Sequence, residues 1–268
     1  MALDASPGLA YERRGRGPQL LLLHGIGHHW RAWEPVMDLL AGAHEVIAVD
    51  LPGFGRSPVP GGGVPRSMPE AVAGVAALLE ALGLDRPHVA GNSLGGALAL
   101  ELAAAGLAAS ATALSPAGFG TPAEMRWALA VLRAHRLGAR LPLPVLRRAL
   151  ALAPLRALAF GTIVARPRRL TAEAALADAL ALRSAKAFDA VARAGRGYAF
   201  RGRPEVPVTI AWGTRDRILF YRQAKRAQQL LPTARHVALP GCGHVPMYDD
   251  PELVARVILE TTRAAAGR

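Results

Sequence analysis

The sequence predicts an α/β fold: a doubly wound, mostly parallel sheet of seven or eight strands with an inserted, all-helical cap. Three observations predict this fold. Short apolar runs alternate with amphipathic segments along residues 11–115 and again along 208–268, as strands and helices do in such sheets. Between these regions, residues 117–202 show only helical periodicity. A glycine-rich turn at residues 91–96 joins a strand-like run directly to a helix-like run.

Length and composition indicate one large globular core. The chain has 268 residues, of which 51% are apolar. Its net charge of +12 raises the possibility of a nucleic-acid or membrane partner. Nearly all the basic residues are arginines, however, and they are spread along the chain without a block of five or six. We therefore attribute them to GC-rich coding and predict no nucleic-acid partner.

The sequence favours a cytoplasmic protein. Cys242 is the only cysteine, which excludes an intrachain disulfide and a thiolate metal site. Residues 1–6 have neither the basic start nor the apolar core of a signal peptide. No run of 18 apolar residues occurs, so we expect no membrane-spanning helix. The oligomeric state stays open.

The first part of the chain predicts five strands, at residues 11–13, 19–23, 45–50, 86–90 and 109–115. The run 19–23 (QLLLL) is continuously apolar, which is typical of a central parallel strand buried on both faces. Helical periodicity covers residues 33–41, 69–82 and 97–105. The residues before Tyr11 are too few and too irregular for a further strand, which favours seven strands over eight.

The alternation of strand and helix stops after residue 116 and resumes near 203. Helical periodicity in between is broken by four prolines: Pro142, Pro144, Pro154 and Pro167. The pattern then predicts a strand at 208–212, a helix at 221–231, a strand at 235–239 and a helix from Pro251 onward. We therefore divide the chain into a core of 1–116 and 203–268 and a cap of 117–202. Such an insert would cover the carboxyl ends of the strands, where ligands bind in these sheets.

Residues 91–96 (GNSLGG) contain the pattern G-x-S-x-G between a strand and a helix, which predicts a nucleophile elbow. Side chains at Gly91 and Gly95 would collide where strand and helix cross. Ser93 would then adopt a strained backbone conformation and stand at the edge of the sheet. The positive end of the following helix would favour an anionic intermediate there. The alternative is a small-residue turn that only begins a tightly packed helix.

A serine nucleophile needs a base and an acid that orients the base. His244 lies in a glycine-rich loop just after the last predicted strand, and Asp216 follows the strand before it. The order Ser93, Asp216, His244 is that of α/β-hydrolases. Asp50 is a rival acid by residue type, but its continuation LPGFG indicates a structural turn. Cys242 lies two residues from His244 but has no elbow of its own, so a thiol nucleophile is disfavoured.

Two backbone N–H groups should form the oxyanion hole. The amide of Leu94 directly follows the nucleophile, and the amide of Ile26 lies in the glycine-containing loop after the 19–23 strand. We expect His24 to be structural, and His28 and His29 to be loop residues near the entrance to the site.

These motifs together resemble those of one family. They are residues 24–27 (HGIG), 50–57 (DLPGFGRS), 91–96 (GNSLGG), 212–216 (WGTRD) and 243–244 (GH). The set resembles the capped α/β-hydrolase family, in particular its serine esterase and lipase-like members, along nearly the whole chain. The resemblance implies a serine hydrolase that acts through an acyl-enzyme without a cofactor or metal. The cap matches no specificity signature, which leaves the substrate open.

We expect a carboxylic ester hydrolase that acts on a small-molecule ester with an apolar acyl group. The cap is rich in leucine and alanine, with Trp127 and Phe160 available to line an apolar pocket. Ser93 argues against epoxide hydrolases and haloalkane dehalogenases, which use an aspartate nucleophile. The alternatives are a thioesterase, a cofactor-free perhydrolase of the haloperoxidase type, a C–C bond hydrolase, or a hydrolase-like ligand receptor with little turnover.

Membrane contact is a further alternative for the cap. Arg147, Arg148 and Arg156 lie among several leucines, and an apolar surface with basic head groups could dock on lipid. The sequence favours a solvated cap face over this interpretation.

Overall fold

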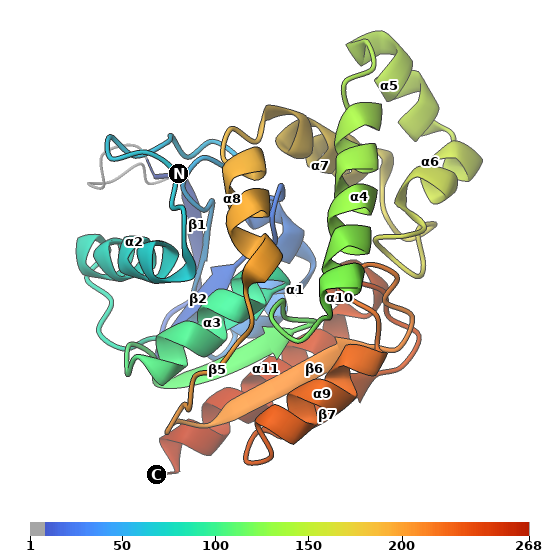
Figure 1. The fold of residues 1–268 in the computed structure, drawn as a ribbon. Helices are drawn as coiled ribbons and strands as arrows, with labels where there is room; N and C mark the ends of the chain where they lie inside the picture. The colour runs from blue at the N-terminus through green and yellow to red at the C-terminus, as the bar shows by residue number, and fades with distance from the viewer. Residues whose placement is uncertain (1–8, 268) are drawn as a thin grey trace.

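A seven-stranded sheet forms the centre of the protein, as the sequence predicts (Figure 1). The computed structural model describes residues 9–267. Both the question of a strand before Tyr11 and the signal-peptide prediction concern residues 1–8, which lie outside the described residues. The strands follow the spatial order β1-β3-β2-β4-β5-β6-β7, and only β1 is antiparallel to its neighbour. Their bounds are β1 Tyr11–Arg14, β2 Gln19–Leu23, β3 Glu45–Val49, β4 His88–Asn92, β5 Ser110–Leu114, β6 Val208–Gly213 and β7 Arg235–Leu239.

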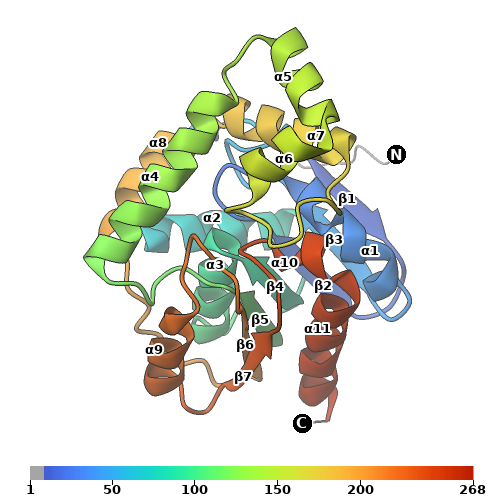
Figure 2. The same cartoon turned by 90° about the vertical axis from the view of Figure 1, so that its right-hand side faces the viewer.

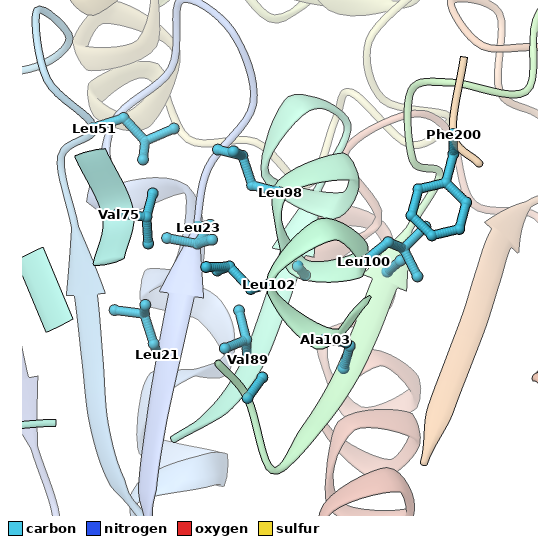
Figure 3. Packing of buried hydrophobic residues seen from close by; sticks show 14 of the residues in the cluster. Leu21, Leu23, Leu51, Val75, Val89, Leu98, Leu100, Leu102, Ala103 and Phe200 are labelled. Carbon is cyan, nitrogen blue, oxygen red and sulfur yellow. The ribbon is translucent and has the colours of Figure 1, made fainter. Parts of the chain in front are cut away.

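Helices cover both faces of the sheet (Figure 2). The four leucines of β2 are fully buried and alternate between the two sides. Leu21 and Leu23 belong to a buried cluster that includes residues of three helices, among others: α2 (Met68–Ala81), α3 (Leu94–Ala104) and α9 (Arg222–Leu230). Figure 3 shows the part of this cluster around α3. Leu20 and Leu22 pack with residues of α1 (Glu34–Ala41) and α11 (Pro251–Ala266). The continuous apolar run is therefore a central strand buried on both faces, as predicted.

The order of the strands brings two loops together. β2 lies between β3 and β4, so the chain reverses its direction across the sheet at β2. Leu23 at the end of β2 is in register with Gly91 of β4. The loop after β2 and the turn after β4 therefore emerge side by side at the carboxyl edge, where ligands bind in open α/β sheets.

Six helical elements lie between β5 and β6, and no strand occurs among them. They are α4 (Pro122–Gly138), α5 (Leu143–Ala151), α6 (Ala153–Phe160), α7 (Ala172–Ser184), α8 (Phe188–Ala194) and the 3₁₀ turn η2 (Gly195–Gly197). We call residues 122–197 the helical insertion. Pro144 and Pro154 lie in the first turns of α5 and α6, where a missing N–H costs nothing, so these prolines start helices rather than interrupt them.

Several boundaries differ from those predicted. β4 continues to Asn92 and α3 begins at Leu94, so Ser93 is the single residue between the strand and the helix. The helix predicted over 33–41 is preceded by a 3₁₀ turn, η1 (Trp30–Trp33), and a short helix, α10 (Pro246–Asp249), precedes α11. Within residues 9–267, no helix combines the length and hydropathy needed to cross a bilayer.

Candidate active site

Ser93 lies at the sharp turn between β4 and α3 with φ 58° and ψ −112°. This is a left-handed conformation that a residue with a side chain rarely adopts. A Cβ on Gly91 would overlap the carbonyl of Gly95, and a Cβ on Gly95 would overlap the carbonyl of Leu23. The turn therefore requires glycine at both positions, as the G-x-S-x-G pattern predicts. The strained geometry is held by a hydrogen bond of 3.0 Å from the Ser93 amide to the Leu114 carbonyl.

The loop after β2 passes directly beside Ser93. A Cβ built on Gly25 would lie 3.2 Å from the Ser93 Cβ, so the two backbones approach closely. The amide of Ile26 in this loop and the amide of Leu94 donate no hydrogen bond to any described residue. Both predicted oxyanion-hole residues thus have backbone donors to offer, at the positive end of α3.

His244 and Asp216 are in contact. The Asp216 Oδ2 lies 2.8 Å from the His244 Nδ1, and both side chains are buried. Because a carboxylate only accepts, we assign the proton of the ring to Nδ1. The other carboxylate oxygen accepts bonds of 2.8 Å from the amides of Ile218 and Leu219. The acid is thus fixed by the backbone, and it fixes the orientation of the imidazole.

The loop that carries His244 is tied to both the sheet and the helical insertion. The Asn92 side chain donates to the carbonyls of His244 (2.9 Å) and Leu114 (3.1 Å). The amide of His244 donates to the carbonyl of Ile163 at 2.8 Å. Asp249 accepts from the amides of Gly243, Ala165 and Arg166, at 2.6 to 3.0 Å. These bonds position the imidazole relative to Ser93.

Ser93 and His244 line one cavity of about 520 Å³ between the sheet edge and the helical insertion. Their side chains form no hydrogen bond with each other, and the His244 Nε2 has no partner among the described residues. Contacts of this kind are often long without substrate. The cavity wall on the insertion side is mostly apolar; it includes Val131, Leu132, Leu146, Leu150, Phe160 and Leu182.

The rival acid Asp50 serves a structural purpose. Its carboxylate accepts hydrogen bonds from the amides of Trp30 (2.7 Å) and Arg56 (2.8 Å), which tie the segments after β2 and β3 together. His24 is structural as well, since its Nε2 accepts from the Leu51 amide at 2.9 Å and its Nδ1 lies 2.7 Å from the Gly25 carbonyl. Complete burial lowers the pKa of His24 to about 3, so this ring stays neutral.

Cys242 is fully buried beside the His244 loop. Burial, together with the carboxylates of Asp249 and Asp250, raises the pKa of its thiol to about 12. A protonated, enclosed thiol is a poor nucleophile. The geometry agrees with the choice of Ser93 over Cys242.

A second group of histidines surrounds Asp178, a residue of α7 that the sequence analysis did not single out. His29 Nε2 lies 3.0 Å from Asp178 Oδ1, and His28 Nε2 lies 3.4 Å from Asp178 Oδ2. The Tyr248 hydroxyl donates to Asp178 Oδ1 at 3.2 Å. His28 and Asp178 also line the cavity. The predicted entrance residues thus connect the core to the helical insertion.

The same three residues form the one group within residues 9–267 whose ligand atoms are close enough together to hold a metal ion. The nitrogens of His28 and His29 and the carboxylate of Asp178 lie within 4.8 Å of one another. Each imidazole instead faces a different carboxylate oxygen, which is the pattern of hydrogen-bonded ion pairs. A lone acid on the apolar face of Ala175, Ala179 and Leu182 was the available sequence signal for Asp178.

Of the two aromatic residues expected in the pocket, Phe160 lines the cavity and Trp127 does not. Trp127 is 47% exposed, near the start of α4. Its indole N–H donates to the Arg217 carbonyl at 2.9 Å, and its ring stacks on Phe220. The expectation for Trp127 was wrong because its position on α4 places it over the loop after β6 instead of over the cavity.

Comparison with known proteins supports the fold. A profile of the alpha/beta hydrolase family matches residues 20–257. An uncharacterized protein of Mycobacterium tuberculosis is 30% identical over 96% of this chain and 79% of its own length. A pimeloyl-[acyl-carrier protein] methyl ester esterase of Aeromonas hydrophila is 43% identical over 35% of each chain. The structure of a thermophilic esterase from Thermogutta terrifontis superposes with a TM-score of 0.69, at 25% identity, over 96% of this chain and 93% of that one. The chain belongs to the alpha/beta hydrolase family.

Proposed function

We propose that the protein is a serine hydrolase that cleaves a carboxylic ester through an acyl-enzyme, with Ser93, His244 and Asp216 as its triad. One observation carries the proposal: the Asp216–His244 contact leaves the second ring nitrogen unpartnered in the cavity that Ser93 lines. A general base oriented in this way can take the proton of a serine hydroxyl.

In the acylation step, His244 Nε2 removes the proton of Ser93 Oγ while Oγ bonds to the carbonyl carbon of the ester. The electron pair of the carbonyl double bond moves to its oxygen. The amides of Ile26 and Leu94 would donate to this oxyanion, and the N-terminal end of α3 adds a favourable potential. Asp216 stabilises the positive imidazolium that forms at the same time.

Collapse of the tetrahedral intermediate breaks the bond to the alcohol, which takes the proton from His244. A water molecule then attacks the acyl-enzyme, with its proton accepted by His244 Nε2. The second intermediate releases the acid and restores the Ser93 hydroxyl as His244 returns the proton. The same nitrogen thus acts as base and as acid in each half-reaction.

An apolar acyl group is the substrate part that the cavity fits best. Leucine, valine and phenylalanine side chains of the insertion provide most of its wall, and burial of apolar surface there would hold the acyl chain. The ester linkage is supported by the relatives named as esterases, one in sequence and one in structure. In this function residues 117–202 act as a cap over the site.

The test combines a covalent probe with turnover. A fluorophosphonate should label the wild type and leave Ser93→Ala unlabelled. A panel of p-nitrophenyl esters of increasing acyl length should be hydrolysed by the wild type and not by the variant. Labelling without turnover of any ester would instead indicate a ligand receptor that keeps its triad. Turnover of thioesters well above that of the matching oxygen esters would indicate a thioesterase.

A further inference from the structure

The positive charge of the chain is concentrated in one segment, although no block of five or six consecutive basic residues occurs. Residues 125–170 contain ten arginines and neither aspartate nor glutamate. The segment therefore accounts for +10 of the net charge of +12. It corresponds to most of α4, to α5 and α6, and to the loop that follows them. Coding bias affects a whole chain and does not explain the lack of acidic residues in one part of it.

Exposed apolar side chains gather in the same segment. Eleven large apolar residues are strongly exposed within 9–267, and seven of them lie between residues 137 and 158. We call these seven the leucine rim: Leu137, Leu141, Leu143, Val145, Leu152, Leu155 and Leu158. The exposed fraction reaches 81% at Leu158. A group of neighbouring apolar side chains of this size usually marks an interaction surface.

The leucine rim is not required to pack α5 and α6 onto the protein. Leu146 and Leu150, one turn apart on α5, and Phe160 at the end of α6 are buried and provide that contact. The rim residues Leu143 and Val145 and the adjacent arginines of α5 remain exposed. Figures 1 and 2 show α5 and α6 at the opposite end of the molecule from α9 and α11, where they form a projecting edge.

The rim also borders the cavity that holds Ser93. Leu141, Leu155 and Leu158 are exposed to solvent and line this cavity as well. The apolar surface outside and the apolar wall inside are therefore continuous. A ligand that leaves an apolar phase at the rim can reach the cavity along apolar side chains.

Several arginines next to the rim are available to an external anion. Arg140, Arg147 and Arg148 are exposed and form no hydrogen bond or ion pair through their side chains within residues 9–267. Arg156 differs, because its guanidinium donates to the carbonyls of Leu150, Ala151 and Leu170 and holds the insertion together. The basic surface is therefore made by the first three residues, without Arg156.

We propose that the leucine rim with Arg140, Arg147 and Arg148 binds the surface of an anionic lipid membrane. The leucines would enter the boundary between head groups and acyl chains, and the guanidinium groups would contact lipid phosphates. A nucleic acid would match the charge but not the exposed leucines. Bound in this way, the protein would place the mouth of its cavity against the membrane. From this position an apolar ester could pass from the lipid into the cavity. This delivery rests on the proposed hydrolase function, whereas membrane binding does not.

Vesicle co-sedimentation at physiological salt tests the proposal. Wild-type protein should sediment with vesicles of phosphatidylcholine and phosphatidylglycerol, and much less with phosphatidylcholine alone. The triple change Arg140→Gln, Arg147→Gln and Arg148→Gln should weaken binding about 100-fold, from about fivefold per arginine near a charged surface. The double change Leu155→Asp and Leu158→Asp should weaken it at least tenfold. Ser93→Ala should bind like the wild type, which separates this result from the test of catalysis.

Matched controls carry the same changes elsewhere. Arg201→Gln with Arg203→Gln removes two exposed charges, and Leu230→Asp replaces a leucine that is 60% exposed on α9. Neither control should change vesicle binding more than twofold. Absence of sedimentation, or equal losses in the controls and the rim variants, overturns the proposal. It is also overturned if the wild type dimerises through the rim, so that Leu155→Asp with Leu158→Asp yields monomers, while vesicles are not bound.

Discussion

Two groups of histidine and aspartate face the same cavity, and they are built in opposite ways. In the first, Asp216 meets the Nδ1 of a single histidine, His244, and leaves Nε2 without a partner. In the second, Asp178 meets the Nε2 atoms of both His28 and His29, and the buried Nδ1 of His28 has no hydrogen-bond partner.

The difference shows that the direction of the imidazole decides what such a pair can do. In the proposed mechanism, the base for Ser93 is the unpartnered Nε2 of a ring that a carboxylate orients through Nδ1, as in the first group. The second group spans α7 and the loop after β2, so it serves to hold the helical insertion against the core. A histidine beside an aspartate in a cavity is therefore not evidence of catalysis until the bonded nitrogen is known.

The acids of the two groups also differ in what surrounds them. Asp216 is held by two backbone amides, whereas Asp178 is held by side chains alone. Burial opposes ionisation of Asp178, but the charges and hydrogen bonds of His28 and His29 outweigh it and lower the pKa of this carboxyl. Burial also opposes the positive charge on His28. The charge and hydrogen bond of Asp178 outweigh this effect of burial and raise the pKa of the imidazole.

The largest expected effect is loss of turnover on changing Ser93 or the first group. Ser93→Ala should remove ester hydrolysis, and Asp216→Asn should lower kcat on the order of 10⁴-fold because the imidazole loses its tautomer and its counter-charge. Steady-state kinetics with p-nitrophenyl esters measures both. Asp50→Asn is the matched control, and our choice of acid is wrong if that variant loses kcat while Asp216→Asn keeps it.

Asp178→Asn should leave the chemistry largely intact and weaken the fold. We expect kcat within about tenfold of the wild type, because the change does not touch a reacting group. The free energy of unfolding should fall by about 1.5–3 kcal/mol, since hydrogen bonds to a buried charge are lost. Urea unfolding followed by circular dichroism measures this loss. A drop in kcat as large as that of Asp216→Asn would end the distinction between the two groups.

The stability difference between wild type and Asp178→Asn should depend on pH. Because folding lowers the pKa of Asp178, its carboxylate stabilises the fold at pH values above the pKa it has in the unfolded chain. This stabilisation is lost as the pH falls through the pKa of the folded state. Because folding raises the pKa of His28, its imidazolium stabilises the fold at pH values below the pKa it has in the unfolded chain. This stabilisation is lost as the pH rises through the pKa of the folded state. The difference should therefore be largest at about pH 5–6 and shrink on both sides. Unfolding midpoints across this range test it, and a difference that is constant with pH contradicts the charged pair.

The smallest effect concerns substrate choice, which we assign to apolar side chains and not to either charged group. Phe160→Ala enlarges the cavity and should change the ratio of kcat/KM for long and short acyl esters about tenfold, the scale of one or two methylenes in an apolar pocket. Trp127→Ala is the control, because this ring lies outside the cavity. The assignment fails if both changes alter the preference equally.

The sequence by itself determined the scaffold and the residues of the first group. Local signals suffice there: the apolar run of β2, the G-x-S-x-G turn, and one acid and one histidine each just after a strand. Parallel strands end at one edge, so residues that follow different strands must converge there. The positions of Ser93, Asp216 and His244 along the chain thus predicted the contact of Asp216 with His244 and the cavity that Ser93 and His244 share.

Only the tertiary structure decided how the helical insertion relates to the site. Helical periodicity predicts that residues 122–197 form helices, but the crossing of these helices over the sheet depends on long-range packing. That packing brings Asp178 to His28 across 150 positions of sequence, turns Trp127 away from the cavity and leaves Leu155 and Leu158 exposed at its mouth. No local pattern encodes which face of a short helix is covered, because the neighbours that cover it come from elsewhere in the chain.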